Sequence, residues 1–465
     1  MGVVGRLGWL GPLAVGACVL TLRMARPWTG SYDANGARYS TAARNYLRYG
    51  LVATRGGQVL LAGEFRPEDI HFYAHHPPGI SLAIAASFGA FGAHEWSARL
   101  VPVVFTLGAT ALMWVVGRQL GGPLVGCLAA LVFVAQPMVA FYGRMPDHEA
   151  PAGFFALAIA ACYGAWERDA RRLWLGLGAA AAFVGVWFAW VVAVVPWLLV
   201  GHHWLTRPRG WGWALVPAAA ATVAVASVLG HVALLQGGLG ELWRALTLRV
   251  GSQAADVGAG AFGLGEFLAR QGSYLWTGFS AVSACLALAW VGGTGSRARA
   301  DALLVAALAI FGILHVVVFK QGAYVHIYYQ FYLALPLALM AALALSELFR
   351  RRRRRWAVLA LGLIAAIGVE AGLKLARLHE ATFYTDQLEM ARQMRERTDP
   401  ADRVLLVGGE ASDFCQLRWY ADRNIRVART RAEGEQLWRE GGFTKAFRVV
   451  RAGSGALEEL PKPPC

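Results

Sequence analysis

The chain has little charge for its length. Only 16% of its 465 residues are Asp, Glu, Lys or Arg, whereas soluble domains contain about a quarter, and 57% are hydrophobic, with a mean hydropathy of +0.44. This composition excludes an ordinary soluble protein and predicts a polytopic helical membrane protein. The net charge of +15 does not indicate nucleic-acid binding, because the basic residues cluster in short loops, as in cytoplasmic loops of membrane proteins.

Other signals are absent as well. Four of the six cysteines lie in apolar segments without metal-ligand spacing, and only Cys415 and Cys465 could pair, in an oxidising compartment. Gly408-Gly409 is followed by no Lys-Ser/Thr, so the pair is too weak a signal for a phosphate-binding loop. We find no clear internal repeat and few charges inside the apolar runs, and both observations disfavour a transporter.

Apolar runs of about 20 residues predict eleven transmembrane helices. The basic loops at 168–172, 207–209, 297–299 and 350–355 then all lie on one side, the cytoplasm. We interpret the first run as an uncleaved anchor with a cytoplasmic N-terminus rather than as a signal peptide. The predicted spans are 7–23, 99–117, 121–142, 151–166, 173–187, 188–201, 211–235, 273–292, 301–319, 326–348 and 356–373.

The segment 77–92 is too short to span the membrane and is predicted to lie in its interface. Residues 27–98 and 237–272 then form two external loops, the second with an amphipathic piece from Glu241 to Arg249. We therefore predict a transmembrane domain at 1–374 and a small extracytoplasmic α/β domain at 375–465. Its expected elements are strands at 403–407 and 447–450 and a helix at 430–440.

Two carboxylates lie close to predicted spans on the outer side, Asp33 and Asp147. A carboxylate there is costly unless it has a partner or a task. Ser31 or Asp33 could cap an amphipathic helix that continues through Tyr49. Asp33 could equally be a general base that takes a proton from an acceptor at the membrane surface.

Basic and aromatic residues are found near the same face. Arg144 beside Asp147 is either a surface ion pair or a group that binds phosphate, with a carboxylate to orient it or a metal. The segment 320–330 is either an aromatic belt or a headgroup site. The candidates for donor phosphate or lipid binding are His75, His76, Arg144, Arg249, Lys320, His326 and Tyr329, and further candidates at the site are Tyr32, His148 and Glu149.

The order of several motifs resembles the GT-C membrane glycosyltransferases. These motifs are Tyr32-Asp33, the helix ending at Tyr49-Gly50, His76-Pro77-Pro78-Gly79, Phe91-Gly92, Glu95-Trp96-x-Ala98-Arg99-Leu100 and Arg144-Met145-Pro146-Asp147. Within that group the chain is most similar to the bacterial branch of glycosyltransferase family 39, related to aminoarabinose transferases and protein O-mannosyltransferases. The match is specific over residues 27–150 and weaker beyond.

The resemblance implies an inverting transfer of a sugar from a polyprenyl-phosphate donor to a lipid, glycan or protein acceptor, at the outer face of the bacterial inner membrane. Asp33 would be the catalytic base and Asp147 the second acid, with Arg144 and His76 near the donor phosphate. No cofactor is required, although a divalent metal is compatible with these residues. The partners implied are the lipid-linked sugar, an unknown acceptor and membrane lipid, with no nucleic acid.

The sequence departs from the family in two places. An acidic-basic pair that relatives often carry before Pro77-Pro78 is replaced by His75-His76. A Lys-Gly of aminoarabinose transferases is replaced by Phe188-Ala189-Trp190, so transfer of that sugar is not expected. Two alternatives remain: a multi-pass transporter or lipid flippase, and a noncatalytic member whose tail binds a partner. A further hypothesis is that the tail selects the acceptor.

Overall fold

The computed structural model describes residues 8–66, 69–206, 214–253, 260–293, 299–351, 353–408, 414–450 and 455–461. The chain forms two compact units. The first comprises Met1–Met24, His75–Gly79 and Leu100–Leu378, and the second Ala25–Ala74, Ile80–Arg99 and His379–Cys465. This division differs from the predicted boundary at residue 374, because most of the first external loop is grouped with the tail; the domain boundary itself stays a prediction. The predictions for 207–209, 297–298, Gly409 and Cys465 lie outside the described residues.

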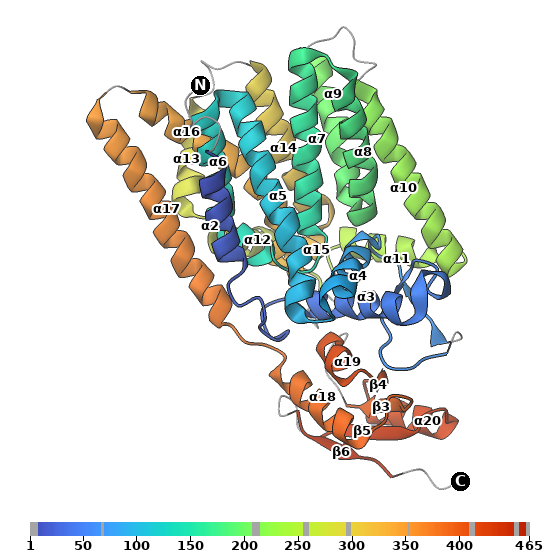
Figure 1. Ribbon diagram of the computed structural model, residues 1–465. Coiled ribbons are helices and arrows are strands. Elements are labelled where there is room, and N and C mark those ends of the chain that lie inside the picture. Colours follow the sequence, from blue (N-terminus) through green and yellow to red (C-terminus); the bar gives the residue numbers. More distant parts are fainter. Residues whose placement is uncertain are drawn as a thin grey trace. The chain divides into compact units, whose positions relative to one another are not determined.

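The first unit is a bundle of helices (Figure 1). Helix α8 packs between α7 and α10, α6 packs against α2 and α16, and α14 contacts both α9 and α16. The bounds are α2 Leu10–Leu20, α5 Glu95–Gly121, α6 Pro123–Ala135, η2 Met138–Tyr142, α7 Glu149–Asp169, α8 Arg172–Phe188, η3 Trp190–Ala193, α9 Val194–Thr206, α10 Leu215–Gln236, α11 Gly240–Val250, α12 Leu264–Gly278, α13 Ala281–Gly292, α14 Arg299–Val318, α15 Lys320–Val325, η7 Ile327–Leu333, α16 Ala334–Arg350 and α17 Arg354–Glu380.

Among the described residues, five helices are long and apolar enough to cross a membrane, or six if a bent pair counts as one span. The full set of eleven spans stays a prediction. Helix α4 (Gly79–Phe91) has 13 residues, so at 1.5 Å per residue it covers about 20 Å, less than the hydrocarbon core of about 30 Å. That length agrees with an interfacial position for 77–92. The amphipathic piece predicted from Glu241 to Arg249 is confirmed as α11.

The eighth predicted span, 273–292, is not one straight helix. It consists of the end of α12 and of α13, which meet at an angle of 109°. Two residues of α17 form hydrogen bonds with the chain at this break. Glu370 accepts hydrogen bonds from the Ser280 hydroxyl (2.6 Å) and the Ala281 amide (2.9 Å), and Lys374 donates one to the carbonyl oxygen of Phe279 (2.8 Å). Lys374 Nζ also lies 2.7 Å from Glu370 Oε1. Local hydropathy could not show this break, because the groups that stabilise it lie about 90 residues away.

We expect Glu370→Ala to lower the free energy of unfolding by about 2 kcal/mol, because it leaves the amide of Ala281 without its acceptor and the ammonium of Lys374 without its counter-ion. The measurement is the thermal unfolding midpoint of the purified protein in detergent. The matched control is Glu347→Ala, whose ion pair with Arg350 is exposed (N to O 3.8 Å) and worth at most about 0.5 kcal/mol. Equal midpoints for the two variants would contradict the capping role.

The second unit combines the external loop with an α/β tail. The tail sheet has the strand order β4-β3-β5-β6, in which β3 pairs in parallel with β4 and β5, and β6 is antiparallel to β5. The predicted strand at 403–407 and helix at 430–440 are confirmed, and the strand predicted at 447–450 begins two residues earlier. The bounds are α3 Asp33–Ala53, β1 Gln58–Val59, β2 Phe72–Tyr73, α4 Gly79–Phe91, α18 Thr385–Arg397, β3 Arg403–Val407, α19 Cys415–Ala421, β4 Asn424–Ala428, α20 Arg431–Glu440, β5 Lys445–Val449 and β6 Leu457–Glu459.

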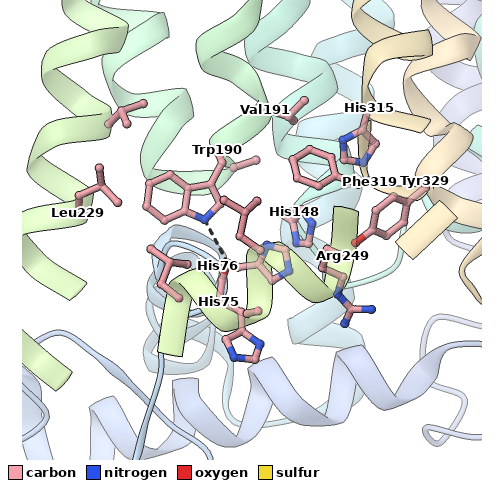
Figure 2. A pocket seen from close by; sticks show the side chains of 15 residues that line it. His75, His76, His148, Trp190, Val191, Leu229, Arg249, His315, Phe319 and Tyr329 are labelled. Atoms are coloured by element: carbon pink, nitrogen blue, oxygen red, sulfur yellow. Dashed lines mark hydrogen bonds between the residues drawn. The ribbon is translucent and has the colours of Figure 1, made fainter. Parts of the chain in front are cut away.

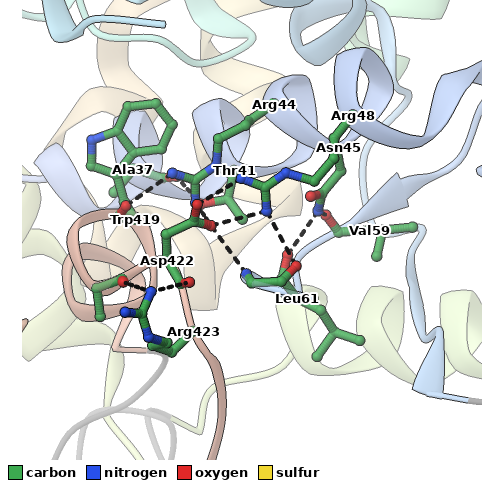
Figure 3. A network of polar contacts seen from close by, with 12 residues as sticks. Ala37, Thr41, Arg44, Asn45, Arg48, Val59, Leu61, Trp419, Asp422 and Arg423 are labelled. Atoms are coloured by element: carbon green, nitrogen blue, oxygen red, sulfur yellow. Dashed lines mark hydrogen bonds and ion pairs between the residues drawn. The ribbon is translucent and has the colours of Figure 1, made fainter. Parts of the chain in front are cut away.

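Helix α3 joins the loop to the tail (Figure 3). Two tyrosines on one face of this helix are buried, with Tyr39 and Tyr46 at most 4% exposed. On the tail side, Asp422 lies 3.0 Å from Arg44 Nη2 and 2.6 Å from Arg48 Nη2, and it accepts a hydrogen bond from the Gly63 amide (3.0 Å). These contacts explain why the loop and the tail form one unit although more than 300 residues separate them in sequence.

Candidate functional site

The first unit contains a cavity of about 270 Å³ (Figure 2). It lies where α8 turns into η3, where α7 begins and where α14 ends. Trp190 donates a hydrogen bond from Nε1 to the carbonyl oxygen of His75 (3.1 Å), which attaches the segment His75–Gly79 to this turn. The lining residues are His75, His76, His148, Ala189, Trp190, Val191, Val225, Leu229, Leu242, Ala245, Leu246, Arg249, His315, Phe319 and Tyr329.

Basic groups gather on one side of the cavity. The rings of His76 and His148 are stacked with centroids 4.0 Å apart. Arg249 projects from α11 and donates a hydrogen bond to Gln321 Oε1 (2.5 Å), which fixes its guanidinium. Among the described residues, no carboxylate is part of the cavity lining. This side can therefore bind an anion, since imidazole N–H groups and a guanidinium are the donors that phosphate oxygens accept from.

Two buried carboxylates lie behind His148. Asp147 Oδ1 is 2.5 Å from His148 Nδ1, and Glu149 Oε1 is 3.3 Å from His148 Nε2. Burial alone would lower the pKa of His148, but the negative charges of Asp147 and Glu149 outweigh it and raise this pKa to about 9. His148 is therefore an imidazolium at neutral pH and presents a positive charge to the cavity.

These three residues are also the one group among the described residues whose donor atoms could hold a metal ion, all within 4.8 Å of one another. A carboxylate pair with a histidine is a suitable donor set for a divalent cation. In the geometry present, however, both nitrogens of His148 already face the carboxylates. A metal would have to replace the proton of His148, so these residues fit a protonated imidazole at least as well as an ion.

Aromatic side chains also line the cavity, and in Figure 2 Phe319 and Tyr329 lie on the same side as His148 and Arg249. Tyr329 comes from η7 and stacks on His315 of α14, with ring centroids 4.7 Å apart. Gly322 makes this position possible, because a Cβ there would lie 2.4 Å from the Tyr329 ring. Neither nitrogen of His315 has a hydrogen-bond partner. The remaining walls are apolar and come mainly from α10 and α11 (Val225, Leu229, Leu242, Ala245 and Leu246).

Five of the predicted site residues line this cavity: His75, His76, His148, Arg249 and Tyr329. Asp147 and Glu149 are not part of the cavity lining, but both lie next to His148, which is. Arg144 is buried and lies over the Phe141 ring, 5.9 Å from its centroid, outside the lining. Lys320 and His326 are not in the lining either, and His326 stacks on Tyr328 (5.0 Å).

Tyr32 and Asp33 belong to the second unit. The interpretation of Ser31 or Asp33 as a helix cap is wrong: α3 begins at Asp33 itself, its N-cap is Tyr32, and no side chain caps it. Tyr32 has φ of 59°, a left-handed conformation that costs a non-glycine residue about 1 to 3 kcal/mol. Asp33 Oδ2 instead accepts hydrogen bonds from the Gly30 amide (2.7 Å) and from Arg99 Nη2 (3.1 Å).

Sequence reasoning missed Trp190, His315 and Phe319. Trp190 and Phe319 resemble ordinary residues of apolar spans, and nothing in their spacing marks them. His315 is an ionisable residue inside a predicted span, which is a recognised signal of function. The apolar wall from α10 and α11 carries no sequence signal, because any membrane helix offers such residues.

The cavity lies at the ends of the helices away from two of the basic loops. The loop 168–172 joins the end of α7 to the start of α8, whereas His148 precedes α7 and Ala189 follows α8. Likewise Tyr329 precedes α16, and Arg350 ends it. In Figure 1 the α7–α8 and α16–α17 connections lie at the same end of the bundle. The cavity and these arginines therefore lie at opposite ends of the first unit.

Comparisons with known proteins fit this architecture. The profile of the family described as dolichyl-phosphate-mannose-protein mannosyltransferase matches residues 75–232, which include the histidine pair, Asp147 and Trp190. No curated protein sequence matches the chain.

Solved structures match over nearly the whole chain. ArnT from Cupriavidus metallidurans, bound to undecaprenyl phosphate, is 16% identical with a TM-score of 0.68, and the match covers 97% of this chain and 94% of that one. The apo oligosaccharyltransferase from Archaeoglobus fulgidus is 11% identical with a TM-score of 0.65, over 96% and 70%. The arabinofuranosyltransferase AftD from Mycobacteria is 16% identical with a TM-score of 0.50, over 88% and 30%.

These matches show that the chain has the GT-C fold of membrane glycosyltransferases. The proteins that it resembles are glycosyltransferases that use lipid-linked donors. At these identities the likeness establishes the fold, and the reaction of this chain has to be argued from its own site.

Proposed function

We propose that this protein transfers a sugar from a polyprenyl-phosphate donor to an acceptor, with inversion at the anomeric carbon. The observation that carries the proposal is the composition of the cavity, which has basic groups on one side and an apolar wall on the other. A lipid phosphate has the same two parts. The presence of undecaprenyl phosphate in the ArnT structure supports this class of donor.

The donor phosphate is assigned to His76, His148 and Arg249, and the start of the prenyl chain to the apolar side chains of α10 and α11. Positive charge at the phosphate stabilises the negative charge that develops on the leaving group. The absence of carboxylates from the lining does not favour a cationic amino sugar. This agrees with the replacement of Lys-Gly by Phe188-Ala189-Trp190.

The chemistry is a single displacement. The acceptor oxygen or nitrogen forms a bond to the anomeric carbon, the bond from that carbon to the phosphate oxygen breaks, and polyprenyl phosphate leaves with the electron pair. Asp33 takes the proton of the acceptor as general base. Asp147 and Glu149 act through His148, whose proton they hold. We propose that no metal is needed, because burial raises the pKa of Glu149 to about 8, so that Asp147 is the main negative charge at neutral pH and the protonated His148 compensates it.

The reaction is assigned to the outer face of a bacterial inner membrane. The support is the position of the cavity at the end of the bundle away from the arginine loops, together with the rule that basic loops stay in the cytoplasm.

Donor binding is expected to weaken as the pH rises through about 9, the pKa of His148, because the imidazole then loses its positive charge while Arg249 keeps its own. The donor phosphate is a diester, so its charge is constant over this range. We expect the Kd to rise about tenfold between pH 7.5 and 10, which corresponds to the loss of about 1.4 kcal/mol of electrostatic attraction between the imidazolium and the phosphate. The measurement is equilibrium binding in detergent. His148→Gln should bind weakly at both pH values, and a Kd of the wild type that does not change with pH would contradict the assignment.

The test of the function is transfer of a radiolabelled sugar from polyprenyl-phosphate donor in membranes that contain the wild type, with and without EDTA. Transfer that persists in EDTA supports the proposal as stated. Transfer that requires added Mg²⁺ or Mn²⁺ would assign Asp147 and Glu149 as metal ligands. Movement of a labelled lipid across vesicles without transfer would favour the transporter or flippase.

A further inference from the structure

Arg99 is one of the most deeply buried charged residues of the chain. It lies in the first turns of α5 and is 1% exposed. A buried guanidinium is costly unless its charge is compensated and its N–H groups are bonded. The sequence offers no role for it beyond its place in the motif Glu95-Trp96-x-Ala98-Arg99-Leu100. Its surroundings in the second unit therefore show what it does.

The guanidinium of Arg99 contacts a carboxylate, a carbonyl oxygen and an aromatic ring. Its Nη2 donates to Asp33 Oδ2 (3.1 Å), its Nη1 donates to the carbonyl oxygen of Arg26, and its plane lies over the Trp28 ring with Cζ 4.1 Å from the centroid. Trp28 is fully buried and packs against α3 at Gly36, where a Cβ would lie 2.4 Å from the indole. Arg99 is thus held from two sides and reaches Asp33 from a fixed position.

The same contacts fix the carboxylate. Oδ2 of Asp33 accepts two hydrogen bonds, one from Arg99 and one from the Gly30 amide (2.7 Å). The side chain of Asp33 is 12% exposed. Because Asp33 does not cap α3, the orientation of its carboxylate is decided by Arg99 and Gly30 and not by the helix. Oδ1 is the oxygen left to accept a proton.

We infer that Arg99 is a positioning residue for the catalytic base: it holds Oδ2 of Asp33 so that Oδ1 faces the acceptor. The inference rests on the proposed function. An arginine suits this role because its guanidinium stays charged at every working pH and its planar N–H groups define a direction. Arg99 transfers no proton itself, and its effect passes entirely through the carboxylate of Asp33.

The test is a double-mutant cycle on transfer, with Arg99→Gln, Asp33→Asn and the double variant in the full-length protein. Arg99→Gln is expected to lower kcat about 30-fold and to change the KM for the donor less than twofold. Arg99→Lys is expected to recover part of kcat. In the Asp33→Asn background, Arg99→Gln should have no further effect, because the carboxylate that it positions is absent.

A loss of folding is distinguished by a matched control. Arg423 is another buried arginine of the second unit (8% exposed). Its Nε and Nη2 donate to Thr398 (2.8 and 2.7 Å), and its Nη1 donates to the carbonyl oxygens of Ala421 and Asp422, so its hydrogen bonds do not involve Asp33. Arg423→Gln should lower the unfolding midpoint without a selective loss of kcat. The inference is overturned if folded Arg99→Gln keeps full kcat, or if its loss is additive with Asp33→Asn. If the residual rate of Asp33→Asn is too low to measure, the decisive comparison is between Arg99→Lys and Arg99→Gln. Equal losses of kcat in these two variants overturn the inference. A wild type without transfer would reject the proposed function itself.

Discussion

Asp33→Asn is expected to lower kcat for sugar transfer by about 1000-fold while the affinity for the polyprenyl-phosphate donor changes less than twofold. An amide keeps the shape of the carboxylate and can still accept a hydrogen bond from Arg99, but it cannot take the acceptor proton. General base catalysis contributes about 100- to 10,000-fold. The residues assigned to the donor phosphate, His76, His148 and Arg249, are unchanged in this variant, so binding of the polyprenyl-phosphate donor should be preserved.

The measurement is single-turnover transfer with purified protein, together with equilibrium binding of the donor. The matched control is Asp399→Asn, an exposed aspartate of the same unit, which should have wild-type values for both. Asp147→Asn should differ from Asp33→Asn in that it weakens donor binding, because Asp147 acts through His148. A wild-type rate for Asp33→Asn would remove it as the base and favour the noncatalytic alternative.

Asp422→Ala is expected to lower kcat at least tenfold although Asp422 lies in the tail. Its carboxylate pairs with Arg44 and Arg48 and accepts the Gly63 amide (Figure 3). Removal leaves two guanidinium groups of α3 without their partner, at a cost of about 2 kcal/mol. Since α3 begins at Asp33, a loosened α3 would also lose the position of the base.

A second contact supports the same expectation. Tyr420 accepts a hydrogen bond from the Trp28 amide (2.8 Å) and donates one to Glu95 Oε1 (2.7 Å). The tail therefore also positions Trp28, whose ring packs against the guanidinium of Arg99. The measurements are transfer rate, unfolding midpoint and limited proteolysis at the tail. The matched control is Glu458→Ala, which breaks an exposed pair with Arg448 in the tail sheet and should change stability by at most about 0.5 kcal/mol. Unchanged kcat in a folded Asp422→Ala would favour a tail that only selects the acceptor.

The class of protein and several elements were predictable because their signals are local. Composition and the length of apolar runs predict a membrane protein whatever the fold. Period-3.6 patterns predicted α3, α11 and α20, and an apolar run ending in glycine predicted β3. His76, Arg249 and Tyr329 were recognised as candidates because a basic or aromatic residue at a membrane face is conspicuous in a chain with so little charge.

The remainder required the tertiary structure, because it consists of pairings between distant residues. The broken span of α12 and α13 is stabilised by Glu370 and Lys374, and the external loop is joined to the tail by Asp422, which no local pattern reveals. The cavity wall from α10 and α11 consists of residues identical in kind to those that face lipid. Above all, a sequence can suggest Asp33 as a base, but only the fold brings Arg99 to its carboxylate, across 66 residues. The sequence by itself determined which side chains have suitable chemistry, and the packing of the helices decided which of them act together.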